Sequence, residues 1–379
     1  MGKRKQLALF FSYNENWIGG TYYILNLVHA LNALPEDKKP CITVVGHQYS
    51  DFKYIKDETA YPYLLFTKDK SGKPLWQKAI NAFSLRILKK KLLVNKLDNK
   101  FDLLFPVFGG SDYLSLIEDE KKVDWIPDFQ DFHLPNLYTP KALVEVKQRN
   151  IAKAYLSTRI VLSSEDAKKD FLLQFPDSQA KIYVIPFSVT HPDLSNLSFQ
   201  NVKEKFHINR PYFYAPNQYW VHKNHQLIIK AIALLKEKNP NFLVLFSGKE
   251  WDPRNPNYTF ELKQLVKDLE VEENIKFLGF LDRAEQLLIM QQAEAVIQPS
   301  LFEGWSTVVE DAKALNKFVF ASNLAVHKEQ LVDNVEFFNP LDTEELANKL
   351  LSYKRLDRNI GYEKCRVQYA EKFMMLVEK

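Results

Sequence analysis

The chain has 379 residues, of which 46% are hydrophobic and 26% are charged, and its formal net charge is +4 at pH 7. This length accommodates two domains of ordinary size, and the composition is that of a soluble globular enzyme. The charge is too small to indicate nucleic-acid binding, and no run of about 18 uncharged apolar residues predicts a membrane span. The two cysteines, Cys41 and Cys365, exclude a disulfide framework and suit a reducing cytoplasm.

The first strand-to-helix turn of the chain is rich in glycine. Residues 7–11 form an apolar run that predicts a buried strand, and Gly19 and Gly20 open a helix that extends to about residue 34. Such a turn lets a phosphate or a sugar approach the backbone closely. A purely structural turn explains the same two residues. There is no G-x-G-x-x-G spacing, which argues against a nicotinamide enzyme.

A basic segment follows the second predicted strand, which covers residues 41–46. Residues 76–100 are predicted to be helical, and residues 86–96 carry five positive charges. A basic amphipathic helix can lie on an anionic lipid surface, and the same pattern also suits a solvated helix face over the core. The residues leave both interpretations open.

A polar loop follows the next pair of strands, which we predict at 101–108 and from residue 123. The loop contains Asp128 and His133 among aromatic side chains. Aromatic rings beside hydrogen-bonding groups suit the apolar face and the hydroxyl rim of a sugar. Asp128 and His133 are therefore candidates for acceptor binding or proton handling, against the more frequent case of a structural histidine.

The chain is predicted to form two domains. Residues 1–190 end with a strand, a well-capped helix and another strand, and residues 191–210 form a short ordered hinge. Residues 211–356 alternate strands and helices at intervals of about 30 residues, as a doubly wound domain requires. Lys223 stands at the start of the first helix of this second domain, where its charge can meet a diphosphate.

The stretch from Gln298 to Ser322 is predicted to be a strand end, a tight loop, a capped helix and a strand. Ligands of parallel sheets lie beyond the carboxyl ends of the strands, so Glu303 in the loop is expected beside a ligand. Free backbone N–H groups of residues 305–308 would face an anion there. Helical spacing places Asp311 at the edge of the buried arc and turns Glu310 towards solvent, although both acids also suit a simple capping or solvating role.

One set of residues in this stretch forms a pattern: Pro299-Ser300, Phe302, Glu303-Gly304-Trp305 and, eight residues after the glutamate, Asp311. The pattern resembles the donor-site signature of the retaining glycosyltransferases of family 4. The string that begins Trp125-Ile-Pro-Asp-Phe-Gln resembles the corresponding segment of a bacterial subgroup of that family. The chain departs from the family in having Gln218 where an arginine is usual, and Pro127-Asp128 where His-Asp is usual.

The resemblance implies an α/β fold of the GT-B type, with two Rossmann-like doubly wound domains facing a deep cleft. It also implies that the C-terminal helix, residues 357–379, crosses back to the N-terminal domain. The activity implied is transfer of a sugar from a UDP- or GDP-type nucleotide sugar to an acceptor hydroxyl with retention, in bacterial surface polysaccharide or glycoconjugate synthesis. The acceptor is then a sugar or a lipid-linked sugar, and the location is the cytoplasm or the cytoplasmic face of the inner membrane.

The resemblance also assigns roles to residues. Glu303 holds donor-sugar hydroxyls, Asp311 holds the ribose, and Lys223 with the amides of Gly19 and Gly20 meets the diphosphate. The catalytic candidates are Glu303, Lys223, Asp128 and His133. The other donor-binding candidates are Asn217, Gln218, His222, Gly248, Phe280, Leu281, Gly304, Trp305, Ser306 and Thr307.

Two further expectations concern what the chain binds and what else it could be. No Asp-x-Asp motif and no histidine cluster with ligand spacing occurs, so neither a metal nor a cofactor beyond the donor is implied. The alternatives are a nucleotide-sugar epimerase or hydrolase of the same fold, and a non-catalytic member that binds sugar nucleotides. The residues do not choose uridine over guanosine, nor do they name the sugar or the acceptor.

Overall fold

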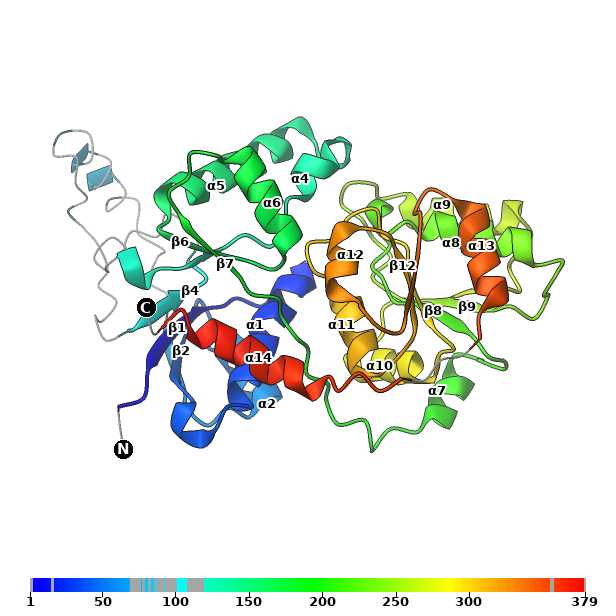
Figure 1. Ribbon diagram of the computed structural model, residues 1–379, viewed down its shortest axis with the longest axis horizontal. Coiled ribbons are helices and arrows are strands. Elements are labelled where there is room, and N and C mark those ends of the chain that lie inside the picture. The colour runs from blue at the N-terminus through cyan, green and yellow to red at the C-terminus, as the bar shows by residue number, and fades with distance from the viewer. Residues whose placement is uncertain are drawn as a thin grey trace. The chain divides into compact units, whose positions relative to one another are not determined.

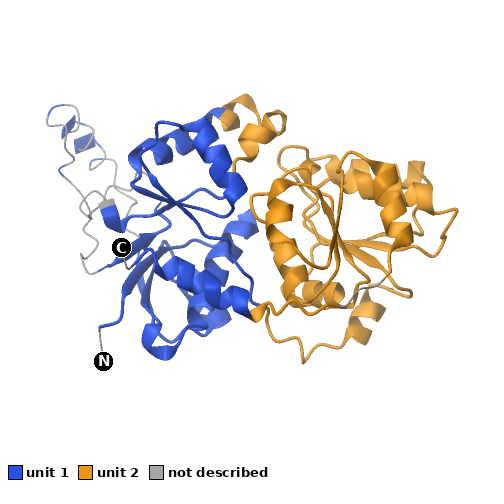
Figure 2. Cartoon of the chain, viewed as in Figure 1, with its two compact units in different colours: residues 1–127, 144–190, 364–379 blue, residues 128–143, 191–363 orange. Residues whose placement is uncertain are grey.

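A computed structural model describes residues 3–14, 17–68, 101–107, 119–354 and 358–377, together with single residues between 76 and 92. The predicted helix at 76–100 and its basic stretch therefore lie largely outside the described residues. The chain divides into two compact units (Figure 2). The first comprises residues 1–127, 144–190 and 364–379, and the second comprises residues 128–143 and 191–363.

The first unit is built on parallel strands. In the part of the chain that the structure describes, these strands form one sheet in the order β3-β2-β1-β4 and another in the order β5-β6-β7. The strands are β1 (Gln6–Phe10), β2 (Cys41–Gly46), β3 (Leu64–Lys68), β4 (Leu103–Phe105), β5 (Asp124–Trp125), β6 (Arg159–Leu162) and β7 (Lys181–Val184). The helices of this part are α1 (Ile18–Asn32), α2 (Tyr49–Thr59), α5 (Pro140–Leu156), α6 (Glu165–Gln174) and α14 (Glu363–Met374) (Figure 1).

The C-terminal helix α14 packs on the first unit, as predicted. The ring of Phe373 lies 5.0 Å from the ring of Phe105 on β4, and Arg159 on β6 donates a hydrogen bond to the carbonyl oxygen of Leu376. The chain thus returns to its first unit after it has built the second.

The second unit is one doubly wound sheet. Its described strands are all parallel and stand in the order β10-β9-β8-β11-β12-β13. They are β8 (Phe213–Ala215), β9 (Val244–Phe246), β10 (Ile275–Phe277), β11 (Val296–Gln298), β12 (Val319–Ser322) and β13 (Val335–Phe338). The helices are α4 (Gln130–His133), α7 (Phe199–Lys205), α8 (His225–Leu235), α9 (Tyr258–Asp268), α10 (Arg283–Gln292), α11 (Thr307–Ala314), α12 (Ala325–Gln330) and α13 (Thr343–Ser352).

Alternate strand residues of the second unit face two separate apolar cores. Phe213 and Ala215 of β8 pack with helices α8, α9 and α13, whereas Tyr214 between them packs with α7, α10 and α11. Successive side chains of a strand point to opposite faces, so a sheet covered on both faces reads as a continuous apolar run. The predicted doubly wound architecture is therefore confirmed, with helices on both faces of the sheet.

The structure departs from the predicted element boundaries at three places. Residues 191–210, predicted as a hinge, contain helix α7 and cluster with the second unit. Residues 128–143, predicted within the first domain, also cluster with the second unit. The end of the chain, predicted to be helical from residue 344, consists of α13 and α14 with non-helical residues 358–361 between them.

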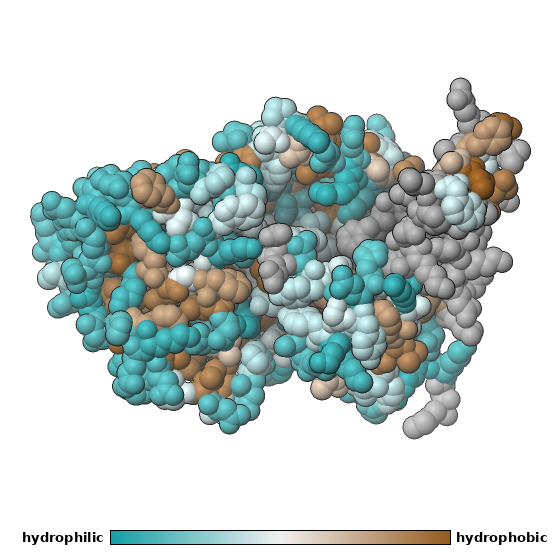
Figure 3. All heavy atoms as spheres, turned by 180° about the vertical axis from the view of Figure 1, so that it is seen from behind, coloured by the Kyte–Doolittle hydropathy of each residue, from teal (hydrophilic) through white to brown (hydrophobic). Residues whose placement is uncertain are grey.

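None of the described helices is both long enough and apolar enough to cross a membrane. The face of the molecule seen in Figure 3 is mainly hydrophilic, with apolar side chains scattered among polar ones.

Candidate functional site

The site candidates of the second unit lie where its strand order reverses. The chain runs from β8 to β9 on one side and reaches β11 on the other, so connections diverge between β8 and β11. Ligands of such sheets bind outside the carboxyl ends of the strands at this point. Asn217 follows β8, and its Nδ2 donates to Oε1 of Gln298, the last residue of β11, at 2.9 Å. This bond fixes the orientation of the Gln298 amide.

Glu303 lies next to this bond and is held through one of its two oxygens. Its Oε1 accepts hydrogen bonds from Lys223 Nζ at 2.5 Å, from Gln298 Nε2 at 2.7 Å and from Ser300 Oγ at 2.7 Å. Among the described residues, its Oε2 has no hydrogen-bond partner. A carboxylate oxygen accepts about two bonds, so Oε1 is saturated and Oε2 is open to a ligand.

The charge of Glu303 is stabilised inside the unit. Burial acts to raise its pKa, but the positive charge of Lys223 and the hydrogen bonds from Lys223 and Ser300 outweigh it and hold the pKa below its usual range. The side chains of Lys223 and Glu303 are only 14% and 9% exposed, so solvent screens this ion pair weakly. The structure therefore brings together the predicted lysine and the predicted first acid.

Asp128, a site candidate predicted from the first half of the chain, interacts electrostatically with Lys223 and Glu303. Burial raises the pKa of Asp128, and the nearby charges of Asp131 and Glu303 add to that effect, whereas the Gln130 N–H and Lys223 oppose it. A carboxyl whose pKa is raised in this way can exchange a proton closer to neutral pH. Close to it in sequence, His133 is exposed, and its ring lies 5.2 Å from the ring of Phe302, beside Glu303.

The start of helix α11 is capped as predicted, but its backbone donors are not all free. Ser306 caps the helix by accepting a hydrogen bond from the N–H of Val309 at 3.4 Å. The N–H of Ser306 donates to Oε1 of Gln330 at 3.2 Å. The prediction that the N–H groups of residues 305–308 all face an anion is therefore wrong at Ser306, because helix α12 supplies an acceptor.

The prediction that Glu310 points to solvent is wrong. Glu310 is 1% exposed and accepts hydrogen bonds from Gln330 at 2.9 Å, from Lys313 at 2.8 Å and from the hydroxyl of Tyr362. Residues from α12 and from the segment before α14 thus cover the face that helical spacing alone turns outwards. Glu310 therefore links α11 to Tyr362 through a buried hydrogen bond.

Asp311 is also 1% exposed, and its partners are cationic or imidazole groups. Arg283 donates to both of its oxygens at 2.7 and 2.5 Å, and His191 Nε2 lies 3.0 Å from its Oδ1. Burial acts to raise the pKa of Asp311, but the charge of Arg283 and the bonds from His191 and Arg283 keep it below its usual range. Asp311 is therefore ionised and held in place by residues that the sequence pattern did not indicate.

Two predicted glycines have packing reasons of their own. A Cβ on Gly20 would lie 2.5 Å from the ring of Trp17, and a Cβ on Gly248 would lie 2.1 Å from the carbonyl oxygen of Asn217. A Cβ on Gly19, by contrast, would meet no atom within 4 Å. Close packing thus explains Gly20 and Gly248, whereas Gly19 leaves open space at the start of α1.

The remaining predicted donor-binding residues differ in exposure. Phe280 is 67% exposed, whereas Leu281 is 7% exposed and belongs to the core cluster of α7, α10 and α11. Asn217 and His222 are buried. Partly exposed side chains belong to Gln218, Trp305 and Thr307, and Gly304 is also partly exposed.

Sequence reasoning missed four residues that hold the site: His191, Arg254, Arg283 and Gln298. Gln298 has a signal, because a polar residue that is 0% exposed at the end of an apolar strand needs polar partners. His191, Arg254 and Arg283 have no such signal, since the predicted site residues that they contact, Asp311 and His222, lie far away in the sequence.

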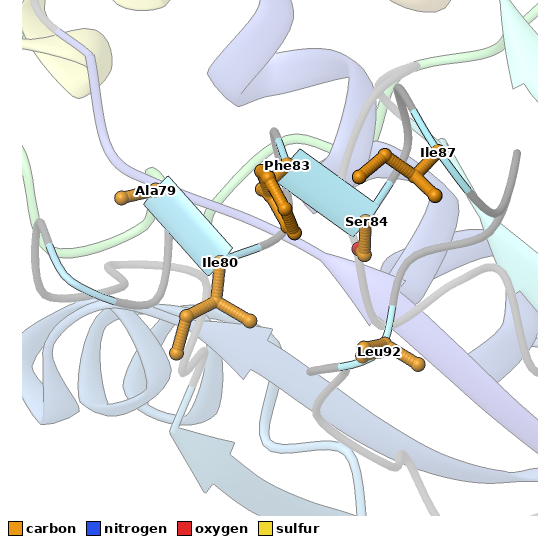
Figure 4. Close-up of a pocket in the computed structure, with 6 residues that line it drawn as sticks. All are labelled: Ala79, Ile80, Phe83, Ser84, Ile87 and Leu92. Atoms are coloured by element: carbon orange, nitrogen blue, oxygen red, sulfur yellow. The ribbon is translucent and has the colours of Figure 1, made fainter.

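A separate pocket of about 550 Å³ is lined by Ala79, Ile80, Phe83, Ser84, Ile87 and Leu92 in the first unit (Figure 4). Only Ser84 among these residues is polar, so the pocket offers no titratable group and no reaction is assigned to it. In the described part of the chain, no group of three or more His, Cys, Asp or Glu side chains is arranged to hold a metal ion.

Comparison with known families matches residues 199–371 to the family described as Glycosyl transferases group 1. The chain is 26% identical over 211 residues to the O-antigen chain mannosyltransferase RfbU of Salmonella typhimurium, which covers 54% of this chain and 56% of that protein. The chain thus spans about half the length of the curated relatives it matches.

Solved structures resemble the whole chain. A glycosyltransferase from Rickettsia africae has a TM-score of 0.65 at 16% identity, with 99% of this chain and 96% of that chain covered. Anabaena HepE in complex with UDP and glucose has a TM-score of 0.64 at 15% identity, with 99% and 95% covered. These likenesses confirm the predicted GT-B fold, an α/β fold with two Rossmann-like units.

Proposed function

Starting from a chain whose residues 199–371 match the group 1 glycosyl transferases, we propose that this protein transfers a sugar from a nucleotide diphosphate sugar to an acceptor hydroxyl. The observation that carries the proposal is the pair formed by Lys223 and Glu303 at the carboxyl ends of β8 and β11. The pair offers a cation for a leaving diphosphate and an open carboxylate oxygen for a sugar hydroxyl.

The leaving group makes the first demand on the site. Departure of a nucleoside diphosphate places negative charge on phosphate oxygens, and preorganised donors stabilise that charge best in a weakly solvated site. Lys223 is such a donor, because its side chain is 14% exposed and already held by a carboxylate. On donor arrival, the ammonium group would exchange Glu303 for the diphosphate or bridge the two.

The sugar makes the second demand. Glu303 is bonded through Oε1 to Lys223, Gln298 and Ser300, which leaves Oε2 as the acceptor for hydroxyl groups of the donor sugar. Hydroxyls that donate to a fixed, ionised carboxylate orient the ring firmly. Asp311, held by Arg283, would take the ribose hydroxyls through its remaining lone pairs.

The acceptor makes the third demand, which is removal of a proton from its attacking hydroxyl. Asp128 suits this role because burial raises its pKa, which makes its carboxylate a stronger base, and because the charges of Lys223 and Glu303 act on it. His133 would bind the acceptor from the exposed side of the same loop.

We propose that the anomeric configuration is retained, which the resemblance of the residue pattern around Glu303 and Asp311 supports.

The proposed substrates draw on the names of the relatives. RfbU is named as a mannosyltransferase of an O-antigen chain, and HepE was solved with UDP and glucose. We accordingly propose a hexose as the transferred group, a UDP- or GDP-linked donor, and a sugar or lipid-linked sugar of a bacterial surface polysaccharide as the acceptor. Contact with the inner membrane is part of the same proposal.

The test measures release of nucleoside diphosphate across a panel of UDP- and GDP-sugars, with and without free and lipid-linked sugar acceptors. Acceptor-dependent release that Glu303→Ala reduces by roughly 10²-fold or more is the expected result. NMR of the product at early times shows whether the new linkage keeps the donor's anomeric configuration. If no donor binds and Glu303→Ala changes nothing, the transferase proposal fails.

The same assay separates the alternative activities. An epimerase or hydrolase of the same fold releases nucleotide at the same rate without any acceptor. A non-catalytic binding protein binds the donor and releases nothing. Either outcome replaces the transferase proposal.

A further inference from the structure

The guanidinium group of Arg254 is held on several sides within the second unit. Its Nε and Nη2 donate to the two oxygens of Asp252 at 3.0 and 3.3 Å, and its Nη1 donates to Oε1 of Gln130 at 2.8 Å. It also lies over the ring of Trp220, 5.2 Å from the ring centre. Since the guanidinium is planar and its donors form a rigid fork, these contacts fix where each N–H points.

One of these N–H groups determines the proton position on His222. Arg254 Nη2 lies 3.2 Å from Nδ1 of His222. Arginine can only donate, so Nδ1 must accept, and the proton of the neutral ring must sit on Nε2. Burial, followed by the charges of Lys223 and Arg254, lowers the pKa of His222 well below its usual value, so the ring is neutral at physiological pH.

The resulting Nε2–H has no acceptor among the described residues, and Nε2 is not one of the buried side-chain atoms that lack a partner. Although His222 as a whole is only 3% exposed, this nitrogen therefore reaches solvent. Lys223 is the next residue in the same short helical turn, Val221–Lys223. The carbonyl oxygen of His222 accepts from the N–H of Leu301 at 2.8 Å, which ties this turn to the loop that carries Glu303. A donor that is fixed in direction and reaches solvent next to a lysine can bind an anionic ligand or a water molecule.

We infer that Arg254 is a positioning residue that fixes His222 as an Nε2–H donor, and that this N–H binds a phosphate oxygen of the nucleotide diphosphate beside Lys223. The inference rests on the proposed function and names the second phosphate donor of the same site. It also answers a departure in the sequence, since the chain has Gln218 where the resembling family usually has an arginine. The neutral imidazole N–H of His222 then supplies a hydrogen bond to the diphosphate where the family usually has a cation.

The first experiment determines the tautomer in the full chain without ligand. Protein labelled with ¹⁵N-histidine is examined by two-bond ¹H–¹⁵N correlation, and the signals absent from His222→Gln assign the residue. The expected result is an Nε2–H tautomer in the unaltered protein and loss of that preference in Arg254→Met. Arg210→Met is the matched control, because Arg210 bonds the carbonyl oxygen of Glu273 just before β10, at the other end of the sheet. An Nδ1–H tautomer, or an unchanged tautomer in Arg254→Met, overturns the inference.

The second experiment measures UDP and GDP binding by calorimetry with two variants of different reach. The amide nitrogen of His222→Gln can replace Nε2–H, whereas that of His222→Asn reaches only the position of Nδ1. We expect the Gln variant to bind within about threefold of the unaltered protein and the Asn variant to bind at least about tenfold more weakly, as for loss of a hydrogen bond to a charged group. Arg254→Lys, which keeps the charge but loses the fork, should behave like the Asn variant.

The outcomes separate this inference from the proposed function. Equal binding by the Gln and Asn variants, with strong binding by the unaltered protein, overturns the inference and leaves the transferase proposal standing. If the unaltered protein binds neither nucleotide, both the phosphate contact of His222 and the transferase proposal fall.

Discussion

The ammonium nitrogen of Lys223 lies 2.5 Å from Oε1 of Glu303, and both side chains are largely buried. Two residues separated by eighty positions in the sequence are thus joined at the carboxyl ends of β8 and β11. A buried ion pair is costly to break from one side only, because the partner that remains keeps an uncompensated charge.

A double-mutant cycle on this pair should therefore show strong coupling. We expect Lys223→Met and Glu303→Gln each to destabilise the protein, by up to about 3–5 kcal/mol where the remaining charge stays buried, and the double variant to regain part of that loss. Thermal or denaturant unfolding of the second unit's transition measures the effect. Additive single effects would show that the pair contributes no net interaction. All three variants should lose transfer activity.

The pair also predicts acid lability. The folded-state pKa values of Glu303 and Asp311 are depressed, so the stability they contribute is fully present above the ordinary carboxyl pKa of about 4 and is lost as the pH falls through the lower folded values. Glu303→Gln should therefore flatten the fall of unfolding free energy at acidic pH. Glu272→Gln, which changes an exposed carboxyl, is the control, and an equal effect of the two variants would contradict the prediction.

Two adjacent glycines of α1 should respond differently to alanine. Gly20→Ala forces a Cβ to within 2.5 Å of the Trp17 ring, so we expect a lower melting temperature. Gly19→Ala enters open space and should leave stability nearly unchanged. Because Gly19 is predicted to contact the donor phosphates, we expect Gly19→Ala to weaken nucleotide binding while stability stays nearly unchanged. A large loss of stability in Gly19→Ala would contradict this division of roles.

The two neighbouring acids of α11 should also separate. Glu310→Gln disturbs a buried tie to Gln330, Lys313 and Tyr362, so we expect a loss of about 1–3 kcal/mol of stability with nucleotide affinity retained. Asp311→Asn should weaken nucleotide binding, and Asp311→Glu should restore part of it by keeping the charge. Calorimetric titration with UDP and GDP, alongside thermal unfolding, measures both properties. The reverse pattern would make Glu310 the ribose-binding acid.

Transfer activity should persist in the presence of EDTA. The site supplies positive charge through Lys223, and the sequence contains no Asp-x-Asp motif that would hold a metal-bound diphosphate. Activity assays in excess EDTA, followed by addition of Mg²⁺ or Mn²⁺, check this expectation. Abolished activity that either ion restores would overturn it.

The sequence predicts elements well where strands and helices alternate and are fully buried. The strand predicted at residues 41–46 is β2, and the predicted capped helix after β11 is α11, whose cap is Ser306. Both predictions depend on local signals, namely apolar periodicity and a side chain that can bond a free backbone N–H. Neither β3 nor α2 is predicted from the sequence. The strand β3 is only partly buried, and its burial pattern is not that of a core strand.

The orientation of Glu310 could not be predicted from α11 alone. Its partners come from α12 and from residue 362, so tertiary contacts override the helical wheel. The same limit explains why residues 128–143 cluster with the second unit although they follow the first in sequence. Their tie to Arg254 through Gln130 is a contact over 124 positions that no local pattern encodes.

The ion pair between Lys223 and Glu303 has a consequence for the design of inhibitors. A charged mimic of the diphosphate has to displace Glu303 from the ammonium group of Lys223. Loss of that ion pair makes the binding of the mimic less favourable. An uncharged linker between nucleoside and sugar leaves the two residues joined and can still reach Oε2 of Glu303 with a hydroxyl. Neutral analogues should therefore lose less affinity here than the charge of the proposed leaving group suggests.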